Sequence, residues 1–140
     1  MSENYKILGK YIKDMSSETA DIETFLFVKD YISKYQLNID ITSKALKNKL
    51  VEINTTLKFE DKDENSKKSH FEIIFATIVR ISDQIKEKKD LQKIILCDVQ
   101  KEIYPDLEKS FLNLLHNSGY PEIKFEKKID FEQLYNQRFN

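Results

Sequence analysis

Several segments of the chain alternate between apolar and polar residues, which is the pattern of a β-strand with one buried face. In residues 35–42 the apolar face comprises Tyr35, Leu37, Ile39 and Ile41. In residues 50–60 the corresponding face comprises Val51, Ile53, Thr55, Leu57 and Phe59. Strands of this kind are typical of antiparallel sheets in which one face is covered and the other meets water.

Residues 70–81 also predict a strand, but one that is apolar on both faces. The first face carries Phe71, Ile73, Phe75, Val79 and Ile81, and the second carries Ile74, Ala76 and Ile78. Such a strand needs cover on both sides, and in a chain this small we expect part of that cover from another subunit. A less regular alternation predicts a further strand over residues 5–13, and the apolar-free residues 60–68 predict a solvated hairpin loop.

The apolar period changes from two to about four after the charged residues 86–90. The resulting stripe comprises Leu91, Ile95, Val99, Ile103, Leu107, Phe111 and Leu115. It predicts a helix of about 25 residues, roughly 40 Å long if unbroken. Pro105 lies inside it, and because proline lacks an N–H and clashes with the preceding turn, we expect a kink or break near Glu102–Pro105.

The sequence also predicts where this helix ends and where a second one begins. Gly119 and Pro121 follow the last apolar turn, as is typical of a helix end. Asp130 is a suitable N-cap for a short terminal helix. The apolar face of that helix would be Phe131, Leu134 and Tyr135. Strands first and helices last predict an α+β fold, with an antiparallel sheet and its helices packed to one side.

Composition narrows the class of protein. The chain has 140 residues, of which 40% are hydrophobic and 34% are charged. This balance is that of a globular domain, so we expect one domain spanning residues 1–140. The chain has no apolar run of about 20 residues, and its first residues lack the features of a signal peptide. The net charge of −1 argues against nucleic acid as the main partner. The single cysteine, Cys97, excludes an internal disulfide and fits a reducing cytosol.

No catalytic motif is present. The two glycines of the chain cannot form a phosphate-binding loop, and one cysteine with two distant histidines does not form a metal-ligand pattern. Cys97 lies in an apolar stretch and is expected to be a packed thiol, whereas His70 is expected at the surface. We therefore assign no catalytic residue, no metal ligand and no cofactor.

Two features allow both a structural and a functional interpretation. Between Asp14 and Val28 the chain carries four acidic residues and no lysine or arginine. This stretch fits either a solvated loop or an acidic patch for a basic partner. The apolar excess of the strands and helices fits either a core with subunit contacts or a groove for extended apolar segments. Periodicity alone does not separate these alternatives.

The residues that carry these patterns resemble the SecB family of protein-export chaperones. The segment KYIKDMSSE (Lys10 to Glu18) is similar to the family's opening strand, and YQLNIDIT and VEINTTLKF look like its second and third strands. The most specific resemblance is C-terminal, in Gly119-Tyr120-Pro121 and in the Asp130-Phe131-x-x-Leu134-Tyr135 motif. The resemblance covers nearly the whole chain.

This resemblance implies a four-stranded antiparallel sheet per subunit, followed by the long helix and the short terminal helix. It implies a homotetramer, a dimer of dimers built through the long helices, in the bacterial cytoplasm. The implied activity is to hold unfolded precursor proteins and pass them to the SecA motor. It implies no enzyme activity, no cofactor, no nucleic-acid partner and no direct insertion into the membrane.

The resemblance also suggests site residues. Asp14 and Glu18 fall on acidic positions through which the family contacts SecA, and Glu72 lies near a third, where this chain has Ile74. The candidate client groove comprises Leu37, Ile39, Ile41, Phe131, Leu134 and Tyr135. The chain departs from the family in its nearly neutral charge, in the lack of an acidic tail after Asn140, and at residues 78–81, where the family has paired glycines.

Two other functions remain open at this point. One is a small-molecule-binding α+β domain or simple acid–base enzyme that would use Asp14 with His70. The other is a SecB-like chaperone dedicated to a toxin–antitoxin pair.

Overall fold

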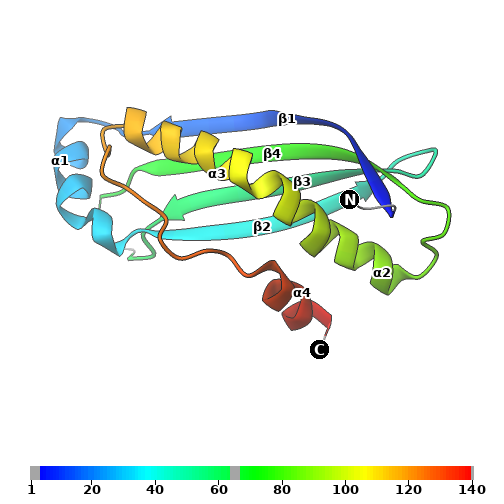
Figure 1. Cartoon of the computed structure of the whole chain (residues 1–140). Helices are drawn as coiled ribbons and strands as arrows, with labels where there is room; N and C mark the ends of the chain where they lie inside the picture. The colour runs from blue at the N-terminus through cyan, green and yellow to red at the C-terminus, as the bar shows by residue number, and fades with distance from the viewer. Residues whose placement is uncertain (1–3, 64–66, 140) are drawn as a thin grey trace.

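A computed structural model describes residues 4–63 and 67–139. It contains a four-stranded antiparallel sheet in the order β1-β4-β3-β2. The strands are β1 (Tyr5–Glu18), β2 (Gln36–Ala45), β3 (Leu50–Glu60) and β4 (His70–Ile81). The long helix crosses one face of this sheet diagonally (Figure 1), and the other face is left open. The predicted α+β class, the four-stranded sheet and the long helix followed by a short terminal helix are confirmed.

The predicted faces are clearest on two of the strands. On β3 the five residues of the apolar face are all buried: Val51, Ile53, Thr55, Leu57 and Phe59. On β4 the residues of the corresponding face are buried as well, whereas Ile74 and Ile78 on the open face remain half-buried. The solvated loop predicted at residues 60–68 includes residues 64–66, which lie outside the described residues.

The strand β1 is longer than the predicted residues 5–13. It contains two β-bulges, between Ile7 and Gly9 and between Ile12 and Asp14. Because each bulge places one extra residue on the strand, the alternation of faces shifts twice, which explains the irregular apolar pattern. Because β1 extends to Glu18, Asp14 and the residues that follow it up to Glu18 belong to a strand and not to a solvated loop.

A helix that the sequence analysis missed follows this strand. Helix α1 (Ile22–Tyr31) leads into a short 3₁₀ turn, η1 (Ile32–Lys34). Asp21 is the N-cap of α1, since its carboxylate accepts a hydrogen bond of 2.8 Å from the Thr24 amide. Aspartate is a favoured residue at this position. The signal in the sequence was therefore Asp21 itself, followed by an apolar segment, although the acidic residues around it suggested a loop.

The long helix is continuous from α2 (Lys88–Lys93) through a π-helical segment, η2 (Ile94–Asp98), to α3 (Val99–Asn117). Pro105 lies within α3, so of the two predicted alternatives a break is excluded. Four consecutive residues of η2, Ile94 to Cys97, are buried. A helix that is covered on a single side buries a stripe of residues, and not four consecutive ones. The terminal helix α4 (Phe131–Phe139) provides the second cover.

A buried glutamine links the π-helical segment to the sheet. The side chain of Gln100 is fully buried and accepts a hydrogen bond of 3.0 Å from the Thr55 hydroxyl of β3. Its amide group donates to the carbonyl oxygen of Ile95 at 3.2 Å. A π-helical segment disturbs the regular hydrogen-bond ladder, and this side chain partners one of the affected carbonyls.

The predicted helix end is confirmed: α3 ends at Asn117, two residues before Gly119. The φ of 112° at Gly119 is left-handed, and the amides of Gly119 and Tyr120 donate to the carbonyls of His116 and Leu115. This is the Schellman pattern of a helix end. A Cβ atom at Gly119 would lie 2.4 Å from the Phe25 ring of α1. The lack of a side chain at Gly119 therefore lets α1 lie close to the end of the long helix. From there the chain runs beside the sheet towards α4 (Figure 1).

Candidate functional site

A groove of about 1120 Å³ opens between η1, the start of β2 and the segment of residues 119–129. Aromatic side chains contribute much of its apolar lining: Tyr35, Phe59, Tyr120 and Phe125. Tyr35 precedes β2 and Phe59 lies near the end of β3, so the sheet provides one wall. The segment of residues 119–129 provides the other wall, without belonging to a strand or helix.

The aromatic rings of this groove form a connected cluster. The ring centroids of Tyr35 and Phe59 are 5.5 Å apart, and those of Phe59 and Phe125 are 5.7 Å apart. Phe71 joins the same cluster 5.7 Å from Tyr120, in an edge-to-face arrangement. Since ring packing of this kind resists displacement, the groove has a firm apolar floor that can receive apolar side chains from another chain.

Charged residues surround the apolar floor. The lining includes four lysines, Lys29, Lys124, Lys127 and Lys128, and three acids, Asp30, Glu122 and Glu126. All seven are exposed. Charges of both signs at the rim do not select a ligand of one charge, so the chemistry of the groove is mainly that of apolar contact.

Of the six residues predicted for the groove, three lie on β2, and only one of these lines the groove. Leu37 lines it, and Ile39 is half-buried on the same face of β2. Ile41 is 5% exposed, and its carbonyl oxygen faces the guanidinium of Arg138 in α4.

The terminal-helix members of the predicted set lie against the long helix. Phe131 and Tyr135 are buried, and Leu134 is half-buried. Phe131 packs edge-on against Tyr104 of α3 at 5.4 Å, and the Tyr135 hydroxyl donates to the carbonyl of Lys89 at 3.2 Å. Within the single chain these residues dock α4, and their role in client binding stays a prediction.

Sequence reasoning missed the second wall of the groove. Ile123 and Phe125 are half-buried and alternate with charged residues. That alternation was available in the sequence as a strand-like signal. However, the segment lies outside the strands of the sheet, and only the three-dimensional path of the chain places it across from Leu37.

The three predicted acidic contact residues gather on the open face of the sheet. Asp14 lies opposite Ile74, and Glu18 lies opposite His70. Glu72 stands between these two positions on β4, opposite Ser16, and is 3.7 Å from the Lys58 ammonium. Since diagonal neighbours on one face are within about 8 Å, these carboxylates form one acidic patch. Its role in partner binding stays a prediction.

The structure separates the pair that an acid–base enzyme would need. Asp14 pairs with Ile74, whereas His70 lies four residues away along β4. At the rise of a strand this separation is roughly 13 Å. Cys97 is 1% exposed, and its burial raises the pKa of the thiol. Residues 4–63 and 67–139 contain no group of three or more ligand-type side chains that could hold a metal ion.

Comparison with known families gives a match over the whole chain. The family model described as preprotein translocase subunit SecB matches residues 1–140. This chain belongs to the SecB family. Proteins of the SecB family are chaperones and not enzymes. Among the residues that the structure describes, no helix is both long enough and apolar enough to cross a membrane.

Relatives agree with this assignment to the SecB family. A putative protein-export protein SecB of Pelagibacter ubique is 62% identical over 140 residues, which is the full length of both chains. The protein-export protein SecB of Mesorhizobium japonicum is 21% identical over 94% of this chain and 77% of its own length.

A solved structure shares the fold. A SecB-like chaperone of Mycobacterium tuberculosis, solved in complex with a ChAD peptide from an antitoxin, has a TM-score of 0.64 and 9% identity. The match covers 89% of this chain and 91% of that one. At this identity the likeness shows a shared fold, and the peptide is a property of that complex.

Proposed function

We propose that this SecB-family protein holds unfolded precursor proteins in the cytoplasm and passes them to the SecA motor. The observation that carries the proposal is the groove of about 1120 Å³ with its aromatic floor, at the edge of the sheet. Relatives named for protein export support the choice of precursors as clients.

Holding would rest on apolar burial in an extended groove. β2 is an edge strand of the sheet, and Leu37 and Phe59 line the groove beside its start. An extended client segment can therefore lie along this edge while its side chains enter the groove. Apolar burial is nondirectional, which fits a chaperone that accepts many sequences. Several weak contacts around an assembly would then combine into tight holding.

Transfer to SecA would use the acidic patch. Asp14, Glu18 and Glu72 are spread over neighbouring strands of a face that the helices leave open. Asp14 and Glu18 are exposed and form no ion pair among the described residues, so they are available to a basic partner. Such charges mainly accelerate and orient association.

We further propose that the protein is a homotetramer, a dimer of dimers. The sheet ends in a long edge strand, β1, whose large apolar side chains remain 42–46% exposed: Leu8, Tyr11, Ile12 and Met15. An edge strand with exposed apolar side chains is a template for pairing with another chain. Light scattering that gives a monomer at micromolar concentration would contradict this assembly.

A client range limited to a toxin–antitoxin pair is the second candidate. The fold likeness to the Mycobacterium tuberculosis chaperone raises it, since that protein was solved with an antitoxin peptide. Capture of client proteins from the source organism distinguishes the two, because a dedicated chaperone retains one partner whereas an export chaperone retains many secretory precursors.

The proposed function is tested by refolding of a denatured precursor in the presence of the purified protein. We expect wild type to slow refolding and to suppress aggregation. Leu37→Glu places a charge in the groove and should weaken both effects about tenfold. Thr42→Glu adds the same charge on the same strand, but at an exposed position on the other face, and should act as wild type. Failure of wild type to affect refolding overturns the proposal.

A further inference from the structure

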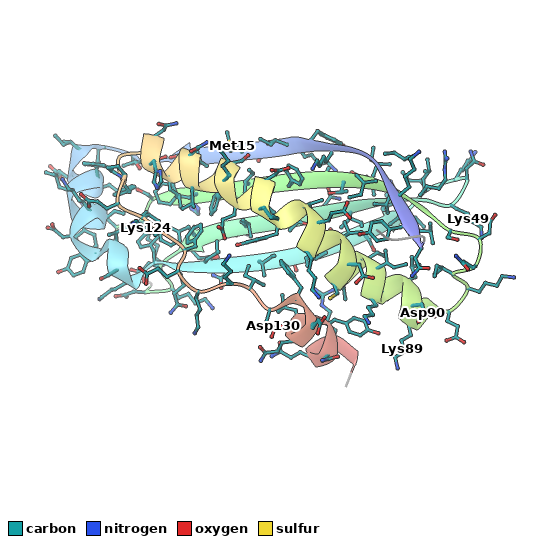
Figure 2. All side chains as sticks on the ribbon, viewed as in Figure 1. Met15, Lys49, Lys89, Asp90, Lys124 and Asp130 are labelled. Carbon is teal, nitrogen blue, oxygen red and sulfur yellow. The ribbon has the colours of Figure 1, made fainter. Side chains whose placement is uncertain are left out.

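The end of the sheet remote from α1 carries a projecting basic hairpin. The end of β2 and the connection to β3 read Lys44-Ala45-Leu46-Lys47-Asn48-Lys49, with every residue exposed and no acid among them. Asn48 and Lys49 both have left-handed φ angles, 63° and 61°. Two such residues in succession have the geometry of a tight type I′ turn. Figure 2 shows Lys49 at this end of the molecule.

Two further cations lie at the foot of the hairpin. Lys6 of β1 is directly opposite Arg80 of β4, and like charges in such a position destabilise a sheet. Among the described residues neither forms an ion pair. Together with Lys49 they line a hollow of about 700 Å³. Three cations against the two acids of the same hollow, Asp83 and Glu102, leave a small excess of positive charge, which fits an anionic group as the ligand.

The acids nearby cancel only part of this charge. The Asp83 carboxylate lies 3.3 Å from the Lys49 ammonium, but its side chain is 94% exposed. Solvent therefore screens this pair. Glu102 also lines the hollow, where it accepts a hydrogen bond of 3.0 Å from the uncharged Tyr5 hydroxyl and offsets one of the three cations. Glu52, across from Lys44, is held by Lys13 at 2.9 Å.

We propose that this basic end binds the surface of an anionic lipid bilayer, with a headgroup phosphate in the hollow between Lys6, Lys49 and Arg80. A projecting turn can reach a flat surface with its tip. The apolar Leu46 is 40% exposed at the turn. There it can reach the boundary between headgroups and acyl chains while the lysines stay with the phosphates. The contact is peripheral.

The same residues fit nucleic acid less well. Single-stranded nucleic acid is bound by aromatic side chains that stack on bases, and residues 44–49 include none. Leu46 would have no role on a phosphate backbone. Each lysine or arginine near an anionic membrane contributes roughly fivefold in binding, so Lys44 and Lys47, together with the positive excess of the hollow, suffice for reversible attachment.

The test is co-sedimentation of the full chain with vesicles. We expect binding to vesicles of phosphatidylcholine with phosphatidylglycerol, loss of binding at high salt, and no binding to phosphatidylcholine alone. Replacing Lys44 and Lys47 by glutamate should weaken it at least about 25-fold. The matched control replaces Lys62 and Lys68 by glutamate and should bind as wild type. These two lysines are exposed in the β3–β4 connection at the other end of the sheet.

Two results overturn the inference: equal binding by the two double variants, or no preference for anionic over neutral vesicles. Tighter binding of a single-stranded oligonucleotide than of anionic vesicles would also contradict the inference, because the ligand of this basic end would then be a nucleic acid. The experiment contains no client protein, so its failure leaves the proposed holding of precursors untouched.

Discussion

The two faces of the sheet differ in burial, and therefore in which residues each face tolerates. On the covered face of β3, Ile53, Thr55 and Leu57 are fully buried beneath the long helix, whereas the open face of the same strand presents half-buried or exposed polar residues. The covered face therefore holds the fold and forms one wall of the groove. The open face can change without unfolding the protein, and for that reason it is available for charged contacts.

The largest effect should come from the covered side, where the end of the long helix meets α1. Gly119→Ala places a side chain in a left-handed conformation and against the Phe25 ring. The change should cost roughly 3 kcal/mol of unfolding free energy, which urea unfolding measures.

Gly9→Ala is the matched control for this variant, because a Cβ atom there meets nothing within 4 Å. Its unfolding free energy should differ from that of wild type by less than about 0.5 kcal/mol. Equal losses in the two variants would disprove the role of Gly119.

The buried polar link between sheet and helix should come next. Gln100→Leu keeps the volume but leaves the Thr55 hydroxyl and the Ile95 carbonyl without this partner. The loss should cost about 2 kcal/mol of unfolding free energy in urea. Adding Thr55→Val removes one of the two orphaned groups and should recover part of the loss. Additive costs in the double variant would show that the two side chains do not act together.

On the open face, function should change while stability does not. Replacing Asp14 and Glu18 by lysine should alter the unfolding free energy by less than about 0.5 kcal/mol. If the acidic patch binds SecA, the same variant should weaken that binding about tenfold, chiefly through slower association. Urea unfolding and surface-based binding kinetics at two salt concentrations measure the two effects. Unchanged affinity removes Asp14 and Glu18 from the contact.

The smallest effect should be on how the unfolding free energy depends on pH, through the Lys13–Glu52 pair. The Lys13 side chain donates a hydrogen bond to Glu52, which lowers the pKa of that carboxyl below its ordinary value of 4.5. Its stabilising contribution is therefore present above that ordinary pKa and is lost as pH falls through the lowered one. Glu52→Gln should lower stability in urea slightly at about pH 7, and this loss should shrink as pH falls below the ordinary pKa of 4.5. A larger loss of stability at acid pH than at about pH 7 would contradict the assigned lowering of the Glu52 pKa.

The same contrast explains which parts of the fold could be predicted. Burial on one side produces a period of two in β3 and a stripe in the long helix, so these elements were found with their faces. The bulges of β1 break that period, and α1 buries only Thr24 and Val28, so its apolar signal is weak. Both elements lie where the chain is least covered.

The candidate site could be predicted only in part. The open face has no burial pattern, and Asp14 and Glu18 were chosen by resemblance, whereas the strand register that groups them with Glu72 needed the structure. Leu37 was found from the alternation of β2. Its partner wall, with Ile123 and Phe125, depends on the path of residues 119–129 after the helix end, which no local pattern specifies.

The most direct test of the groove as the client site is site-specific photocrosslinking to an unfolded precursor. A photoreactive residue at position 37, in the groove, should crosslink to the precursor, and one at position 42, exposed on the other face of the same strand, should not. Crosslinking from position 42 and none from position 37 would contradict the central claim that clients bind in the groove on the covered side of the sheet.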